Sequence, residues 1–153
     1  KYYSGTAIYT NSFHFSKNQI SNKKIDFYLD LGVVKDIAHV FLNDVDLGLI
    51  WTAPWKVKIP EGLLKKKNNK LVVKITNVWA NRLIGDEQEP DDCLWLPGHK
   101  GGKFLKEFPD WFTNNKPRPS QGRYCFTTWN YFTKESPLIS SGLLGPVRII
   151  QEE

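Results

Sequence analysis

Alternation of apolar and polar residues with a period of two runs through much of this chain and limits its possible folds more than any other feature. Trp55, Val57 and Ile59, for example, alternate with Lys56 and Lys58. Because successive side chains of a β-strand point to opposite faces of its sheet, this pattern predicts strands with one buried face. The same period is present in five further runs, at residues 7–15, 25–31, 71–76, 123–128 and 147–149. Many short strands with little helix are typical of a β-sandwich or barrel.

One hairpin can be placed from the sequence alone. Residues 37–42 are mostly apolar, Asn43-Asp44 follow them, and residues 45–51 resume the alternation. Asn and Asp tolerate the positive φ angles that tight hairpin turns require. The sequence therefore predicts two antiparallel strands joined by a two-residue turn at Asn43-Asp44.

The 153 residues fit one domain, predicted to cover residues 1–153. A long irregular loop is expected from about residue 80 to residue 122, because this stretch is rich in Gly and Pro and has no clear strand pattern. Long loops inside compact domains are often functional. Short helical turns are predicted at 61–67 and at 110–114, the second with Asp110 as its N-cap. The chain begins at Lys1 and contains no Met, which favours a piece of a longer protein.

The charge pattern argues against two classes of partner. The formal net charge is +5, but the densest basic run, Lys65-Lys66-Lys67, lies between two predicted strands and is interpreted as a solvated turn. Aromatic residues do not interleave with the basic residues as single-stranded nucleic acid binding would require. The apolar runs are much shorter than the ~20 residues of a membrane helix. We expect neither nucleic acid nor membrane as a partner.

Metal binding and disulfide formation are only loosely constrained. Cys93 and Cys125 are too few for a paired Cys-x-x-Cys site, and a single disulfide and two free thiols both remain open. The three histidines lie in unrelated segments. We expect no cofactor, with calcium bound by some oxygens of the acidic stretch as the alternative. That stretch consists of Asp86, Glu87, Glu89, Asp91 and Asp92.

Catalytic residues are not expected in this chain. It contains neither a Gly-x-Ser-x-Gly motif nor a His-Glu-x-x-His motif. Glycoside hydrolysis normally needs two carboxylates about 5–10 Å apart across the sugar. All five residues of the acidic stretch lie on one segment with turn formers, whereas catalytic carboxylates usually come from separate rigid elements.

The candidate binding residues lie where the strand at 71–77 enters the long loop. An indole can stack on the CH face of a sugar, while amide, guanidinium and carboxylate groups bind its hydroxyls. The alternative is that the tryptophans close the end of the core and that Arg82 pairs with Asp86 or Glu87. The sugar-binding candidates are Trp79, Asn81, Arg82, Asp86 and Trp129.

Several motifs are recognisable at this point. In the first half they are residues 3–9 (YSGTAIY), 29–34 (LDLGVV), 40–48 (VFLNDVDLG), 51–55 (WTAPW) and the alternating run 69–77. They resemble the sugar-binding jelly-roll domain of family-2 glycoside hydrolases, which has the galactose-binding-like fold. The usual Asn-Gly of the hairpin turn is replaced here by Asn43-Asp44, which a tight turn also accepts.

The second half resembles a narrower group. Its motifs are residues 77–88 (NVWANRLIGDEQ), 127–129 (TTW), 136–138 (SPL) and 141–147 (SGLLGPV). They are similar to the C-terminal region of family-106 α-L-rhamnosidases, so that the resemblance spans nearly the whole chain.

The resemblance implies an all-β, galactose-binding-like jelly-roll β-sandwich with one long irregular loop excursion. It implies a non-catalytic accessory domain of a bacterial glycoside hydrolase that acts on plant polysaccharide, in the periplasm or outside the cell. In such enzymes a separate (β/α) barrel carries the catalytic acid and base. The expected partners are carbohydrate and the catalytic domain of the same polypeptide. The alternative is a purely structural domain that docks on the barrel and binds no sugar.

Overall fold

The computed structural model describes residues 1–16, 26–125 and 131–152, and these form two compact units. We call Gly5–Val78 together with Ser140–Glu153 the sandwich unit. We call Lys1–Ser4 together with Trp79–Ile139 the loop unit. Within the described parts of the chain, no helix is long and apolar enough to cross a membrane.

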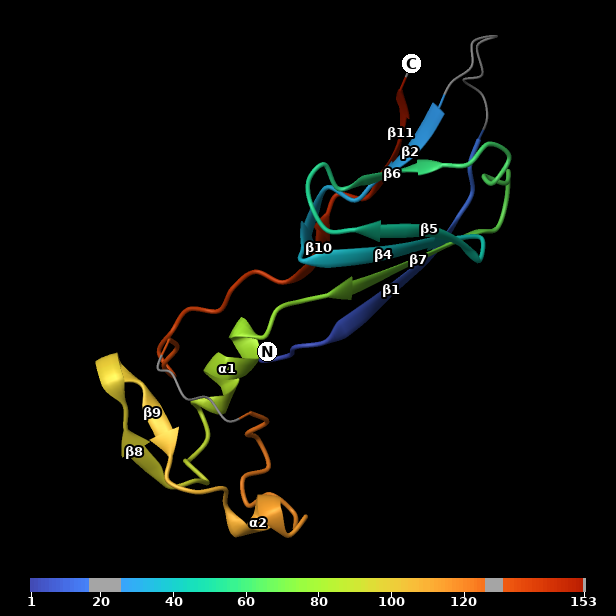
Figure 1. The fold of residues 1–153 in the computed structure, drawn as a ribbon. Coiled ribbons are helices and arrows are strands. Elements are labelled where there is room, and N and C mark those ends of the chain that lie inside the picture. The colour runs from blue at the N-terminus through green and yellow to red at the C-terminus, as the bar shows by residue number, and fades with distance from the viewer. Residues whose placement is uncertain (17–25, 126–130, 153) are drawn as a thin grey trace. The chain divides into compact units, whose positions relative to one another are not determined.

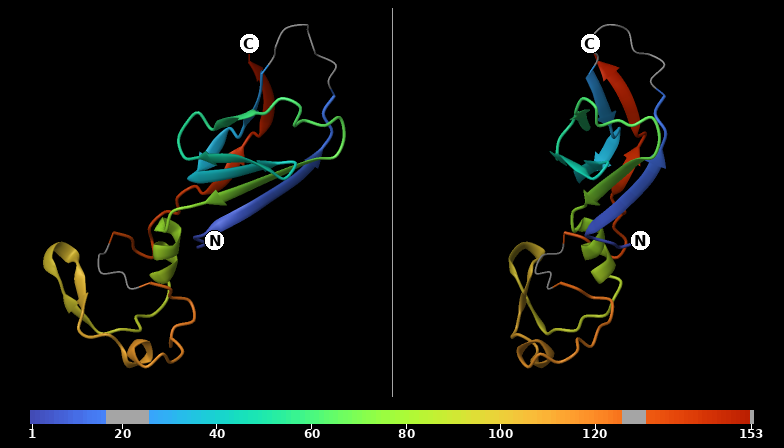
Figure 2. Two further views of the ribbon diagram at one scale, coloured as in Figure 1. Left: turned by 45° about the vertical axis from the view of Figure 1, so that its right-hand side comes forward. Right: turned by 90° about the vertical axis from the view of Figure 1, so that its right-hand side faces the viewer.

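The sandwich unit consists of antiparallel strands (Figure 1). A four-stranded sheet has the order β1-β7-β4-β5, a three-stranded sheet the order β11-β2-β6, and β10 pairs with β3. Figure 2 shows these strands from two further directions. The strands are β1 (Thr6–Phe13), β2 (Asp26–Asp30), β3 (Val33–Lys35), β4 (Ile37–Leu42), β5 (Val45–Ile50), β6 (Lys56–Ile59), β7 (Asn69–Thr76), β10 (Gly142–Gly145) and β11 (Arg148–Glu152).

Apolar side chains from the strands of these sheets form the core of the sandwich unit. In β4 the alternate residues Ala38, Val40 and Leu42 are buried, and β7 has the same alternation. Leu29 of β2 and Ile59 of β6 belong to the same apolar cluster. Burial in these strands therefore follows the period-two alternation of the sequence, and the predicted all-β sandwich is confirmed.

The predicted hairpin is also confirmed. Leu42 pairs with Val45 across a two-residue turn, and Asn43 and Asp44 have φ angles of 52° and 65°. Positive φ at both central residues is the geometry that matches the twist of a two-stranded ribbon. The side chain of Asn43 donates to the backbone oxygen of Leu63 at 2.7 Å and accepts from the backbone amide of Lys70 at 2.9 Å.

The loop unit has more regular structure than its sequence indicated. Two short strands form a hairpin in a region where we expected no strand, because a pair of three-residue strands is too short to give a readable alternation. The elements are α1 (Ala80–Asp86), β8 (Trp95–Pro97), the 3₁₀ helix η1 (His99–Gly101), β9 (Lys103–Leu105) and α2 (Asp110–Thr113).

Three finer expectations need comment. The helical turn at 110–114 is confirmed as α2, but its N-cap is Pro109 and not Asp110, because Pro109 is still extended (φ −65°, ψ 149°). Residues 61–67 contain no helix, with a turn at 61–62 and a bend at 66–67. Of the strand predicted at 123–128, residues 123–125 are not in a strand, and the rest lies outside the described residues.

Candidate functional site

Four of the five sugar-binding candidates lie on or beside α1 of the loop unit. Trp79 is the N-cap residue of α1, and Asn81, Arg82 and Asp86 lie within the helix. Residues 82 and 86 are four apart, so their side chains share one face of the helix. The fifth candidate, Trp129, lies outside the described residues.

Asp86 is fully buried and joins α1 to the segment that contains Tyr124 and Cys125. Its Oδ1 accepts from Arg82 Nε at 3.0 Å and from the backbone amide of Tyr124 at 3.2 Å. Its Oδ2 accepts from the backbone amide of Cys125 at 3.0 Å and from the Cys125 thiol at 2.6 Å. A buried carboxylate with this many donors is tied to its own chain. The alternative pairing of Arg82 with Asp86 is therefore the one observed.

Asn81 is also buried and joins α1 to the segment at Ile139. Its Nδ2 donates to the backbone oxygen of Ile139 at 2.8 Å, and its Oδ1 accepts from the backbone amide of Ile139 at 2.8 Å. This pair of bonds mimics a β-bridge and fixes the segment that leaves the loop unit to α1. Both polar atoms of the amide thus have partners within the chain.

Trp79 and Arg82 differ in their surroundings. The Trp79 side chain is exposed, with 60% of its surface accessible. The guanidinium of Arg82 donates from Nη2 to the backbone oxygen of Gly122 at 3.2 Å and lies 4.7 Å from the centroid of the Tyr124 ring. Arg82 is thus held between Asp86 and Tyr124, whereas Trp79 offers a free surface to solvent.

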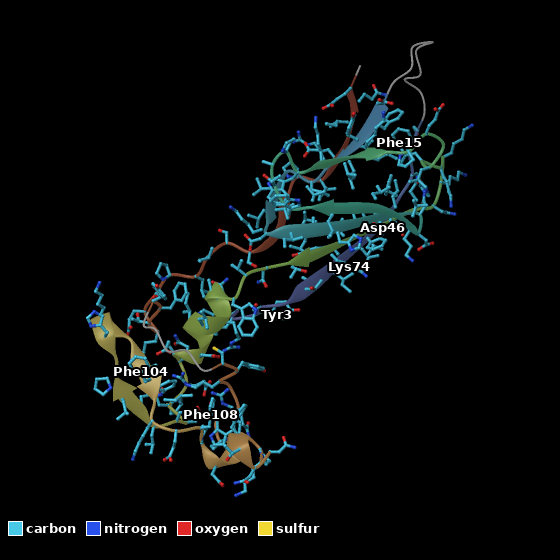
Figure 3. The ribbon with its side chains drawn as sticks, viewed as in Figure 1. Tyr3, Phe15, Asp46, Lys74, Phe104 and Phe108 are labelled. Carbon is cyan, nitrogen blue, oxygen red and sulfur yellow. The ribbon has the colours of Figure 1, made fainter. Side chains whose placement is uncertain are left out.

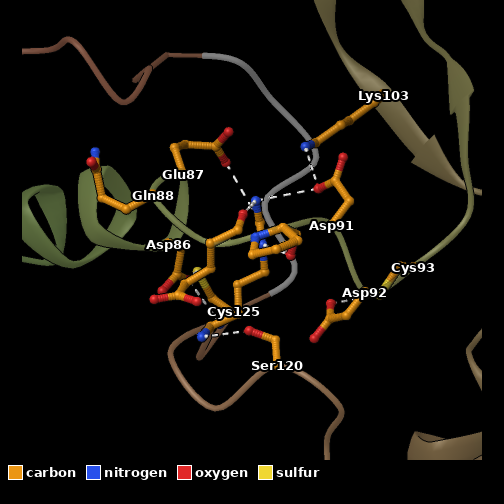
Figure 4. A network of polar contacts seen from close by, with 12 residues as sticks. Asp86, Glu87, Gln88, Asp91, Asp92, Cys93, Lys103, Ser120 and Cys125 are labelled. Carbon is orange, nitrogen blue, oxygen red and sulfur yellow. Dashed lines mark hydrogen bonds and ion pairs between the residues drawn. The ribbon is translucent and has the colours of Figure 1, made fainter.

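Arg123 organises the acidic stretch, a role that was not apparent from the sequence. It is buried, and its guanidinium donates to the backbone oxygens of Pro90 at 3.1 Å and Glu89 at 3.2 Å. It also forms ion pairs with Glu87 at 3.6 Å and with Asp91 at 3.3 Å. Figure 4 shows Glu87 and Asp91 in this polar network. The acidic stretch is therefore not a uniformly solvated loop face. The run of carboxylates is the sequence signal that could have prompted a search for cationic partners elsewhere in the chain.

A second arginine holds Asp92. Arg118 donates to the two carboxylate oxygens of Asp92 at 2.5 Å and 3.1 Å, and its guanidinium lies 4.9 Å from the centroid of the Trp111 ring. Burial would raise the pKa of Asp92, but hydrogen bonds from Arg118 and Cys93, together with the charges of Arg118 and Arg123, outweigh it and hold this pKa below its usual value.

Both cysteines are thiols that donate to carboxylates. Cys125 donates to Asp86, and Cys93 donates to Asp92 at 3.4 Å. Burial and the hydrogen bond to Asp92 raise the pKa of the Cys93 thiol to about 11. Among residues 1–16, 26–125 and 131–152, no group of three or more His, Cys, Asp or Glu side chains is placed to hold a metal ion.

The polar arrangement of the loop unit thus ties its segments together. Ile84 is the one buried apolar side chain among the described residues of this unit, whereas the sandwich unit has an extended apolar core. Around Ile84 the buried groups are polar: Asn81, Asp86 and Arg123. Ion pairs and side-chain-to-backbone hydrogen bonds therefore hold the fold of the loop unit where hydrophobic burial is small.

Comparison with known proteins identifies the relatives of this chain. No family model matches it. The sequence is 47% identical over 150 residues to a protein of Formosa agariphila described as "Putative beta-glucuronidase", an alignment that covers 97% of this chain and 12% of that protein. The structure is similar to that of a rhamnosidase from Novosphingobium sp. PP1Y, with a TM-score of 0.66 and 30% identity over 99% of this chain and 11% of that one.

The chain therefore spans about an eighth of the length of the β-glucuronidase-type relative and a similar share of the rhamnosidase. Both proteins are named as glycoside hydrolases, and nearly all of this chain aligns with each. The chain is a β-sandwich domain related to glycoside hydrolases.

Proposed function

We propose that this chain is a non-catalytic accessory domain of a larger bacterial glycoside hydrolase of the family-106 α-L-rhamnosidase type, which acts on plant polysaccharide outside the cytoplasm. The share of each relative that the chain matches supports a domain of a much longer enzyme. The ion-paired carboxylates of the acidic stretch support a structural role over acid–base catalysis. Asp86, Asp91 and Asp92 of this stretch each form an ion pair with an arginine.

The exposed apolar face of the β8–β9 hairpin supports docking of this domain on another part of the enzyme. Leu96 pairs directly with Phe104, so both side chains project from one face of the hairpin. They are 49% and 61% exposed, whereas Trp95 and Leu105 on the other face are half-buried. Figure 3 marks Phe104 on this hairpin.

A two-stranded hairpin is marginally stable by itself, and its free edges invite pairing. No third strand joins β8 and β9 within the described residues. Leu96 and Phe104 would be buried if this face packed against another part of the longer polypeptide. We propose that this part is the catalytic domain. The length of chain by which both relatives exceed this domain supplies such a partner.

Hydrogen exchange tests the docking. Backbone amides of residues 94–106 should exchange quickly in the isolated 153-residue chain and at least about tenfold more slowly within the longer polypeptide. Amides of β7 should have the same protection in both and serve as the internal reference. Equally fast exchange of the hairpin in both samples would contradict docking at this face.

Two variants of the longer polypeptide test whether the hairpin face is an interface. Replacing Leu96 and Phe104 by Ser should lower its thermal stability. Leu49→Ser, at a side chain with 63% exposure on the sandwich unit, is the matched control and should have little effect. If the hairpin variant and the control behave alike, the hairpin face is not an interface.

Sugar binding is the second candidate function, and the exposure of Trp79 favours it. In this proposal the indole of Trp79 stacks on a sugar, with Arg82, Asn81, Asp86 and Trp129 as its neighbours. Asn81 and Asp86 would act indirectly, because their polar atoms are bonded to the chain. Titration with rhamnose or galactose should quench tryptophan fluorescence in the wild type but not in Trp79→Ala. Identical titration curves for the two proteins would contradict this site.

A further inference from the structure

A pocket opens on the loop unit between the end of the acidic stretch and α2. Its volume is about 600 Å³, within the range of about 300–1,000 Å³ that is usual for small-molecule sites. All the residues that line it belong to the loop unit. They are Asp91, Asp92, Cys93, Leu94, Glu107, Phe108, Pro109, Asp110 and Thr113.

Phe108, the aromatic residue in the described lining of this pocket, is exposed and yet held in place. The Phe108 ring stacks on the Phe112 ring, with centroids 5.3 Å apart and an interplanar angle of 25°. Trp111 meets Phe112 edge-on at 6.1 Å, and Arg118 lies over Trp111. Phe108 nevertheless keeps 59% of its surface accessible, and Figure 3 marks its place. A braced ring that remains in water is suited to stacking on an apolar ligand face, because little side-chain entropy is lost on binding.

The polar lining consists of acceptors. Asp92 is oriented by Arg118, and Asp110 accepts from Lys116 at 2.5 Å. Asp91 and Glu107 complete the set of carboxylates, and the described lining contains no Lys or Arg side chain. Cations outside the lining thus hold Asp91, Asp92 and Asp110. Carboxylate oxygens fixed in this way accept hydrogen bonds from neutral hydroxyl groups and disfavour an anion.

The carboxylates alone would indicate only a solvated surface; the cavity and the braced Phe108 ring beside them point to a ligand. We propose that this pocket binds one neutral sugar unit of a saccharide chain, with its CH face on Phe108 and its hydroxyls donating to Glu107 and Asp110. The proposal rests on the carbohydrate-associated function proposed above, but it uses different residues from the site at α1. It also predicts that uronic acids are disfavoured, although the chain as a whole carries a net charge of +5.

The test is a titration of the isotopically labelled 153-residue chain with methyl rhamnoside, methyl galactoside and galacturonic acid, monitored by amide chemical shifts. Neutral sugars should shift the amides of residues 91–94 and 107–113, and galacturonic acid should bind at least about tenfold more weakly. Phe108→Ala should weaken binding by about tenfold or more, and Glu107→Gln should weaken it less. Leu49→Ser, at an exposed side chain of the sandwich unit, should bind as the wild type does.

Several results would overturn the proposal. One is the absence of shifts in the pocket at about 10 mM neutral sugar, a concentration at which a ligand with millimolar Kd occupies most sites. Another is binding that is lost in Trp79→Ala but kept in Phe108→Ala, which would assign the sugar to α1 instead. Tighter binding of galacturonic acid would exclude the proposed selectivity. If Phe108→Ala fails to fold, Phe108→Leu keeps the apolar volume and removes the flat ring, and it should still weaken binding.

Discussion

The carboxylate of Asp86 binds Cys125 twice, with Oδ2 lying 3.0 Å from the backbone nitrogen and 2.6 Å from the thiol sulfur. The two residues are 39 positions apart, so this contact closes much of the loop unit on α1. Arg82 supplies the balancing charge from the preceding turn of the same helix. The buried carboxylate of Asp86 therefore fixes the end of the long loop, at residues 124–125, to α1 at its start.

Removal of this acid should destabilise the loop unit strongly. Asp86→Ala leaves the Arg82 guanidinium and two backbone amides without their acceptor, and breaking a buried ion pair costs about 3–5 kcal/mol. Amide exchange in residues 80–92 and 118–125 should accelerate accordingly, while β4 and β7 of the sandwich unit keep their protection. Asp86→Asn keeps one acceptor oxygen and should have a smaller effect. Uniform loss of protection in both units would contradict the local role.

The thiol of Cys93 should be poorly reactive at neutral pH. Its pKa is raised to about 11 by burial and by its hydrogen bond to Asp92, and the thiolate is the reactive form. In a Cys125→Ala background, alkylation of Cys93 by iodoacetamide should accelerate about tenfold per pH unit from neutral pH to about pH 10. A plateau reached below pH 9 would contradict the assignment.

Asp92→Asn provides the matched test of the cause. It removes the negative charge that disfavours the thiolate, so that the pKa of Cys93 should fall and alkylation at pH 8 should become faster. If the variant reacts at the wild-type rate, the Asp92 carboxylate does not control this thiol.

The Asp92–Arg118 pair should also give the loop unit a specific acid sensitivity. The pKa of Asp92 in the folded chain lies below its unfolded value of 3.8. Its contribution is therefore fully present above that value and is lost as the pH falls through the lower, folded pKa. The difference in unfolding free energy between the wild type and Asp92→Asn should be nearly constant at higher pH and shrink in the acid range. Circular dichroism melts across that range measure it, and a difference that grows on acidification would contradict the pairing.

The sandwich could be predicted from the sequence, and the inner structure of the loop unit could not. In β4 and β7 each residue's neighbours two positions away report its burial, so Val40 and Val73 reveal their side of the sheet locally. Apart from the neighbouring Arg82, the partners of Asp86 lie more than 30 residues away, and so do the acidic-stretch partners of Arg123. No local periodicity in the sequence encodes such pairs. The ion pairs of Arg123 could not be predicted, because its carboxylate partners lie at the other end of the long loop.

The candidate site shows the same division. The sequence predicted sugar-binding residues within 79–86, and this stays a prediction; in the structure, α1 makes polar contacts with other segments of the loop unit. What residue types alone could not decide is which polar atoms face the chain and which face water. Asn81 and Asp86 turn inward, whereas Phe108 remains exposed beside a pocket that no motif marks.

The hairpin turn at Asn43-Asp44 offers a stability test of the sandwich unit. Asp44 has a φ of 65°, a left-handed conformation that costs most residues about 1–2 kcal/mol and costs Gly little. Asp44→Gly should therefore stabilise the chain by up to about 1 kcal/mol in urea denaturation, since Asp is one of the more tolerant residues at such positions. The ion pair of Asp44 with Lys70 is exposed, and its loss should subtract little.

Asp44→Val is the opposing control for this turn. A β-branched side chain is strongly disfavoured at positive φ, so that this variant should lose more than about 1 kcal/mol. Asn43 should not be replaced in the same experiment, because its side chain bonds Leu63, Asn69 and Lys70 and its loss would mix two causes. If Gly and Val at position 44 shift the midpoint in the same direction, the turn does not depend on positive φ at this residue.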